Sequence, residues 1–143
     1  MDLSRCLPAL LLSLSLAAPA AALTCEEGIA TGSAPLLTPV ITATLNGDYR
    51  SLTEAIDPIA AMGQPARQQL IAELEALSPL GYEDCAVLVA RPLGPEFETY
   101  LLMFASSGQR LYAFLGAARI NGAWTVIHHR FSPDFAQAYD LLR

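Results

Sequence analysis

The spacing of apolar residues changes once along this chain, close to residue 84. Before that point, apolar residues recur every three or four positions, which is the period of a helix with one buried face. The pattern predicts a first helix that ends at Asn46-Gly47-Asp48, a second opened by the capping box Ser51-Leu52-Thr53-Glu54, and a third that starts at Pro65. Pro58 is expected to kink or shorten the second helix.

After residue 84, apolar residues alternate with polar ones or form short runs, which is typical of β-strands. The predicted strands are Cys85–Arg91, Phe97–Ser106, Gln109–Ile120 and Ala123–Phe131. Asn121-Gly122 has the sequence of a type I′ hairpin turn, and the other links are also short, so the strands form an antiparallel meander. A last helix begins at Ser132-Pro133-Asp134. The fold class is therefore α+β, with N-terminal helices packed on a four-stranded antiparallel meander and a C-terminal helix.

The Asn121-Gly122 turn sets the register of the last two strands, with Leu115 opposite His128 and Ala113 opposite Arg130. One face of the sheet is then expected to carry Glu98, Tyr100, Leu102, Phe104, Leu111, Ala113, Leu115, Ala117, Arg119, Trp124, Val126, His128 and Arg130. The opposite face is expected to carry Phe97, Leu101, Met103, Tyr112, Phe114, Gly116, Ala118, Ile120, Ile127, His129 and Phe131.

Both of these faces are largely apolar, which is unusual for a solitary antiparallel sheet. The helices can cover one face, and the other needs a partner or an enclosed ligand. The pattern therefore predicts either a homodimer formed through the sheet or a curved sheet around an apolar cavity, open to a small apolar ligand or a protein partner.

The best polar cluster in these apolar surroundings is centred on His128. Its expected neighbours on the same face are the candidate ligand-binding residues Tyr100, Arg119, Trp124 and Arg130. His128 is the candidate catalytic residue, as a general base with an arginine holding an anionic ligand. The alternative is a hydrogen-bonded histidine at the rim of a core, with arginine side chains lying over Trp124. His128 and His129 point to opposite faces of a strand, so no shared metal site is expected.

Residues 1–22 have the layout of a secretory signal peptide. Arg5 lies in a short head, residues 7–18 are mostly apolar, and Ala20-Ala21-Ala22 supplies the small residues of a cleavage site. Cleavage would leave residues 23–143 as a single α+β domain, periplasmic or secreted, with no remaining stretch long enough to span a bilayer.

Removal of the signal peptide would also reduce the number of cysteines from three to two. Cys6 is removed, which leaves Cys25 and Cys85. In an oxidising compartment, an isolated pair of cysteines is expected to form a disulfide. The two cysteines lack Cys-x-x-Cys spacing and a clustered third ligand, so neither a metal nor another cofactor is predicted.

The charge pattern argues against two classes of partner. The chain has a net charge of −6, and its eight basic residues, all arginine, are scattered along it. An acidic chain of this kind is not expected to bind nucleic acid or an anionic membrane surface.

The stretch from Asn121 to Ser132, with Asn-Gly, Trp, apolar residues, His-His and Ser in that order, resembles the last hairpin strand of nuclear-transport-factor-like (cystatin-like) α+β domains. The resemblance implies a cone-shaped fold with an apolar pocket between sheet and helices, commonly dimeric. It implies no single activity, because members include isomerases, dehydratases and cyclases as well as proteins that only bind. The steroid-isomerase type uses acids in the pocket, and the only acid within the four predicted strands is Glu98.

Two functions from different classes remain open on this evidence. The first is a small exported binding or interaction module without catalysis, which an inhibitor or immunity-type protein would also match. The second is an isomerase or lyase that uses His128 in an apolar pocket. A deep pocket on which His128, Tyr100 and an arginine converge favours the enzyme, whereas a surface position of His128 favours the binding module.

Overall fold

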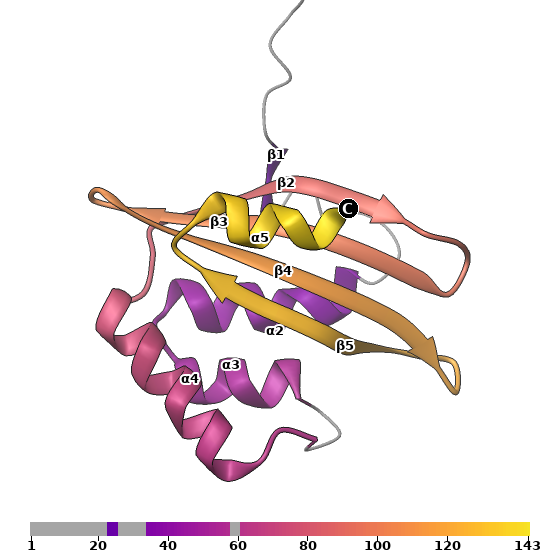
Figure 1. Cartoon of the computed structure of the whole chain (residues 1–143), viewed down its shortest axis with the longest axis horizontal. Helices are drawn as coiled ribbons and strands as arrows, with labels where there is room; N and C mark the ends of the chain where they lie inside the picture. The colour runs from indigo at the N-terminus through magenta and orange to yellow at the C-terminus, as the bar shows by residue number, and fades with distance from the viewer. Residues whose placement is uncertain (1–22, 26–33, 58–60) are drawn as a thin grey trace, which may run out of the picture.

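An antiparallel sheet forms the centre of the computed structural model, which describes residues 23–25, 34–57 and 61–143 (Figure 1). Its strands lie in chain order and are β1 (Leu23–Thr24), β2 (Asp84–Pro92), β3 (Phe97–Ser106), β4 (Gln109–Ile120) and β5 (Ala123–Ser132). The four long strands begin and end within one residue of their predicted limits, and the predicted α+β meander is confirmed. The predicted signal peptide, residues 1–22, lies outside the described residues.

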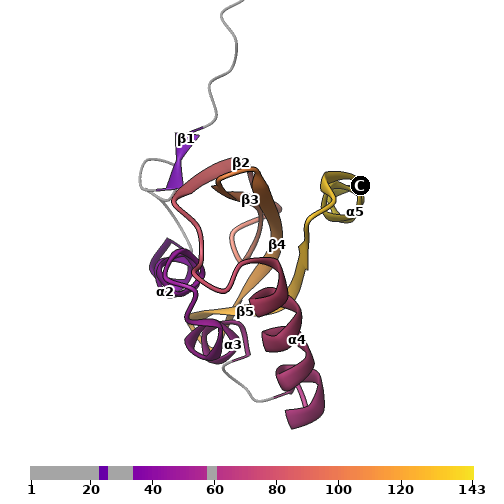
Figure 2. The same cartoon turned by 90° about the vertical axis from the view of Figure 1, so that its left-hand side faces the viewer.

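Helices lie on both faces of this sheet (Figures 1 and 2). The N-terminal helices α2 (Ala34–Leu45), α3 (Tyr49–Ile56) and α4 (Gln64–Leu77) cover one face, and the short helix α5 (Phe135–Tyr139), extended by the 3₁₀ turn η1 (Asp140–Leu142), lies on the other. No helix within the described ranges is long and apolar enough to cross a membrane.

The C-terminal helix changes the expectation for the second face of the sheet. Ala138 of α5 packs on Leu101 and Phe114, and all three side chains are buried. The expectation that this face needs a partner is therefore wrong for the part beneath α5. The chain covers that part with its own C-terminus.

The beginning of α3 also differs from the prediction. Asp48 is the N-cap, and its carboxylate accepts hydrogen bonds from the backbone N–H of Ser51 at 3.1 Å and from the Ser51 hydroxyl at 2.6 Å. The helix therefore starts before Ser51, which lies in the first turn rather than at the cap. α3 ends at Ile56, and Pro58 lies outside the described residues.

The main core lies between the sheet and the N-terminal helices. Its fully buried members from the sheet are Leu102, Phe104, Leu111, Ala113 and Leu115, and those from the helices include Leu37, Val40 and Leu52. Phe104 pairs with Leu111 and Tyr100 with Leu115, as the predicted register of β3 and β4 requires.

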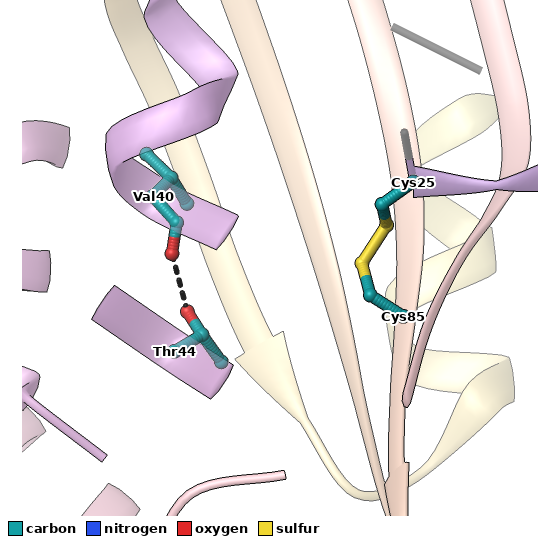
Figure 3. The surroundings of a disulfide bond; sticks show 4 residues. All are labelled: Cys25, Val40, Thr44 and Cys85. Carbon is teal, nitrogen blue, oxygen red and sulfur yellow. Dashed lines mark hydrogen bonds between the residues drawn. A yellow bond between two sulfur atoms is a disulfide. The ribbon is translucent and has the colours of Figure 1, made fainter. Parts of the chain in front are cut away.

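A disulfide joins Cys25, directly after β1, to Cys85 in β2, with the two Cα atoms 5.3 Å apart (Figure 3). The predicted pairing is confirmed. Helix α2 passes close to this link, and there Thr44 Oγ1 donates a hydrogen bond to the carbonyl oxygen of Val40 at 2.7 Å. The disulfide ties the start of the domain to the first long strand of the sheet.

Candidate functional site

A β-bulge in β5 changes which of its side chains face the helices. From the turn up to Val126, the register of β4 and β5 is the predicted one. Ile127 is then an extra residue without a partner in β4, so every later residue of β5 is displaced by one position. Leu115 pairs with His129, and the predicted pair of Leu115 with His128 is wrong.

His128 and Arg130 consequently lie on the outer face of the sheet, together with Phe114 and α5. The exposed imidazole of His128 stands edge-on to the Phe114 ring, with ring centroids 5.5 Å apart, and Arg130 Nη2 donates to Gln137 Oε1 at 3.4 Å. The prediction that His128 and Arg130 share a face with Tyr100 is therefore wrong. The catalytic role of His128 stays a prediction, and none of the cavities described below includes it.

The other three predicted site residues lie on the helix-facing side but do not form a cluster. Tyr100 is buried, and its hydroxyl donates to Glu98 Oε2 at 2.5 Å. Arg119 is exposed beside the hairpin turn, where its Nε donates to the Gly122 carbonyl oxygen at 3.3 Å. Trp124 is half-buried opposite Arg119. Their predicted roles in ligand binding stay predictions.

A groove of about 550 Å³ opens between the end of α3, the start of α4 and β5. We call it the α4–β5 groove. Its apolar lining consists of Ile56, Ala61, Met62, Ala66, Leu70, Val126 and Ile127. Its only described polar side chains are Asp57 and His129. A smaller apolar hollow of about 360 Å³ shares Leu70 with the groove and lies farther along α4, against Phe131.

Asp57 follows α3 directly, is 8% exposed and uses both carboxylate oxygens. One oxygen accepts from the backbone N–H of Ala61 at 2.8 Å, and the other from Arg67 Nη2 at 2.9 Å; Met62 N–H is shared between the two oxygens at 3.2 and 3.1 Å. Burial raises the pKa of Asp57, but these hydrogen bonds and the Arg67 charge outweigh it, so the pKa lies below its ordinary value. Asp57 therefore acts first as a structural carboxylate that ties the end of α3 to α4.

His129 enters the groove from the opposite wall and is half-buried. Burial lowers its pKa, the neighbouring His128 lowers it further, and the Asp57 charge opposes them without reversing the shift. The imidazole is therefore neutral at pH 7, with one ring nitrogen as a donor and the other as an acceptor. Within the described part of the chain, the imidazole makes no hydrogen bond, and its closest ring neighbour is Phe131, with centroids 6.2 Å apart.

A second sizeable hollow, of about 620 Å³, lies at the turn between β3 and β4. Its charged members Glu83, Asp84 and Arg110 are exposed to water. Water weakens the interaction of a ligand with such charges, so this hollow is a poorer candidate than the smaller but more apolar α4–β5 groove. Among the described residues, no three His, Cys, Asp or Glu side chains gather closely enough to hold a metal ion.

Asp57 and His129 are the candidate residues that the sequence did not reveal. Asp57 lies within the predicted second helix but off its apolar face, where an acid is usually solvated, and no spacing rule connects it with a histidine 72 positions later. The alternating pattern places His129 on the wrong face, because Val126 and Ile127 are both apolar and nothing in the sequence shows that Ile127 is the extra residue of a bulge.

Comparisons with known proteins identify little beyond the architecture. No protein-family model matches the chain, and no curated protein matches it. Among solved structures, the chain is similar to an NTF-2-like protein of unknown function from Silicibacter pomeroyi, with 16% sequence identity and a TM-score of 0.46. The match covers 68% of this chain and 89% of that one.

Proposed function

We propose that this protein is a small exported binding module that holds a small apolar ligand in the α4–β5 groove and catalyses no reaction. The observation that carries the proposal is the lining of the groove, whose described residues comprise seven apolar side chains, one carboxylate with both oxygens hydrogen-bonded and one neutral imidazole. A site of this composition favours apolar ligands and offers few polar groups to fix their orientation.

Export is the second part of the proposal. Residues 1–22 have the layout of a signal peptide, and the two cysteines outside this stretch are the two that form the disulfide. Stable disulfides are typical of periplasmic and secreted proteins and rare in the bacterial cytosol.

We do not favour an isomerase or lyase that acts through His128. Its side chain is exposed on the outer face of the sheet, away from the groove. A general base must come within hydrogen-bond reach of the proton that it removes, and a ligand in the groove lies on the other side of the sheet.

Binding in the groove can be tested with the neutral fluorescent probe N-phenyl-1-naphthylamine, whose emission rises in apolar surroundings. Ala66 lines the groove from an exposed position on α4, so Ala66→Phe would fill the groove without disturbing the core. Ala72 is exposed on the same helix and lines none of the hollows described, so Ala72→Phe is the matched control.

We expect Ala66→Phe to weaken probe binding at least tenfold, because the added ring occupies the space of the probe. Ala72→Phe should bind within twofold of the wild type. The same affinity for all three proteins, or no binding by the wild type up to the solubility of the probe, would contradict the proposed function.

A further inference from the structure

We propose that His129 makes the α4–β5 groove selective for neutral apolar ligands that carry a hydroxyl group, that is, apolar alcohols and phenols. This inference rests on the proposed function, since it names the class of ligand that the groove takes. It is carried by the position of His129, by the hydrogen bonds already made around it and by the charges that it faces.

The bulge at Ile127 determines the position of His129. Without the extra residue, His129 would lie on the outer face, and His128 would face the helices. With the bulge, Val126, Ile127 and His129 all line the groove. The strand therefore presents two apolar side chains and one imidazole to the same space.

Among the described side chains that line the groove, the hydrogen bonds leave the His129 imidazole as the polar group available to a ligand. Both oxygens of Asp57 are occupied by Ala61, Met62 and Arg67. The His129 imidazole makes no hydrogen bond within the described part of the chain. Burial keeps the imidazole neutral, so one ring nitrogen can donate and the other can accept. A ligand in the groove that offers no hydrogen bond would displace water from this group without replacing its interactions.

The charges near the groove disfavour an ionised ligand. The charged group that acts on His129 across the groove is Asp57, at the end of α3, which is paired with Arg67 on α4; His128 adjoins His129 on β5. The described lining of the groove holds no arginine or lysine, and Asp57, its one carboxylate, is paired with Arg67 at 2.9 Å, so an anionic ligand would find no cation to pair with among these residues. A hydroxyl group carries no charge and both donates and accepts, so it matches either tautomer of a neutral imidazole.

The test compares three probes of nearly equal size by their displacement of N-phenyl-1-naphthylamine at pH 7.5: naphthalene, 1-naphthol and 1-naphthoate. One net hydrogen bond should make 1-naphthol bind roughly three- to tenfold more tightly than naphthalene to the wild type. The charged 1-naphthoate should bind more weakly than either.

Variants of the adjacent histidines separate the role of His129 from a general effect on the strand. His129→Leu keeps an apolar side chain in the groove, so it should bind naphthalene as well as the wild type does and lose the preference for 1-naphthol. His129→Asn, which retains a donor and an acceptor, should keep part of the preference. His128→Leu, on the outer face, should keep all of it.

Equal binding of naphthalene and 1-naphthol to the wild type would overturn the inference and leave the proposed function intact. The same conclusion follows if the preference survives in His129→Leu, or if 1-naphthoate binds most tightly. If none of the three compounds displaces N-phenyl-1-naphthylamine, or if they displace it from Ala66→Phe as readily as from the wild type, both the inference and the proposed function fail.

Discussion

Asp57 and His129 line the same groove, but their pKa values are lowered for different reasons. Hydrogen bonds and an ion pair to the carboxylate stabilise the charged form of Asp57 and outweigh its burial. Burial destabilises the charged form of His129, whose imidazole makes no hydrogen bond within the described part of the chain. The hydrogen-bonding capacity of Asp57 is therefore used within the fold, whereas that of His129 is available to the proposed ligand.

The lowered pKa of His129 predicts a particular dependence of stability on pH. In the unfolded chain, the imidazole takes up a proton as the pH falls through about 6.5, whereas the folded protein resists protonation to a lower pH. The unfolded state then binds more protons, so the free energy of unfolding should decrease as the pH is lowered from about 7.5 to 5.

Urea unfolding across this pH range would measure that decrease. His129→Leu should flatten it, because the variant has no imidazole whose pKa differs between the two states. His128→Leu should reduce it only in part, because burial is the larger cause of the lowered pKa of His129 and the neighbouring His128 the smaller one. A steeper decrease in His129→Leu than in the wild type would show that the imidazole is better protonated in the folded state than in the unfolded one.

At the scale of the elements, the turns were predictable, and the distortions within elements were not. Gly and Pro mark the ends of helices and strands with specific backbone requirements, so the four long strands lie where the pattern places them. The extra residue of the bulge, Ile127, is apolar and follows the apolar Val126, so the sequence pattern does not reveal it. The face of His129 therefore could not be predicted. Asp48 and Ser51 are both good capping residues, and tertiary packing decides which of them begins α3.

Two of the helix connections also meet at a pair of glycines, Gly47 after α2 and Gly81 before β2. A Cβ atom at Gly81 would lie 2.1 Å from the Leu45 carbonyl oxygen and 2.4 Å from the Gly47 nitrogen. Gly81 also has a φ of +81°, which favours glycine. The α2–α3 turn can therefore approach the α4–β2 turn only because position 81 carries no side chain.

Gly81→Ala should consequently destabilise the protein by about 3 kcal/mol or more, as the sum of a backbone penalty and a forced separation of the two turns. Gly108, in the turn between β3 and β4, is the matched control because it has a φ of +86° with nothing within 4 Å of its Cβ position. Gly108→Ala should carry the backbone penalty alone, about 1 kcal/mol. Equal losses in chemical unfolding would show that the contact between the turns contributes nothing.

At the scale of the whole molecule, helix α5 and the disulfide both stabilise the sheet, the first by covering its outer face and the second by a covalent link to β2. Helix α5 shields the outer face around Leu101 and Phe114, so a small domain has core on both sides of one sheet. The disulfide joins Cys25, beside the two-residue strand β1, to Cys85 in β2. A strand as short as β1 pairs with β2 through two residues alone, so we expect the disulfide to help hold it at the edge of the sheet.

The disulfide closes a loop with a sequence separation of 60, and in the chain-entropy model it stabilises the folded state by about 4 kcal/mol. Cys85→Ser in the exported protein should therefore lower the urea midpoint markedly, and reduction of the wild type should lower it by a similar amount. Cys6→Ser is the control that also tests the proposed export, because cleavage after Ala22 would remove residue 6 and yield protein of unchanged mass that begins at Leu23. A mass that still includes residues 1–22 would contradict the signal peptide, whereas an unchanged midpoint in Cys85→Ser would show that the link adds no stability to the fold.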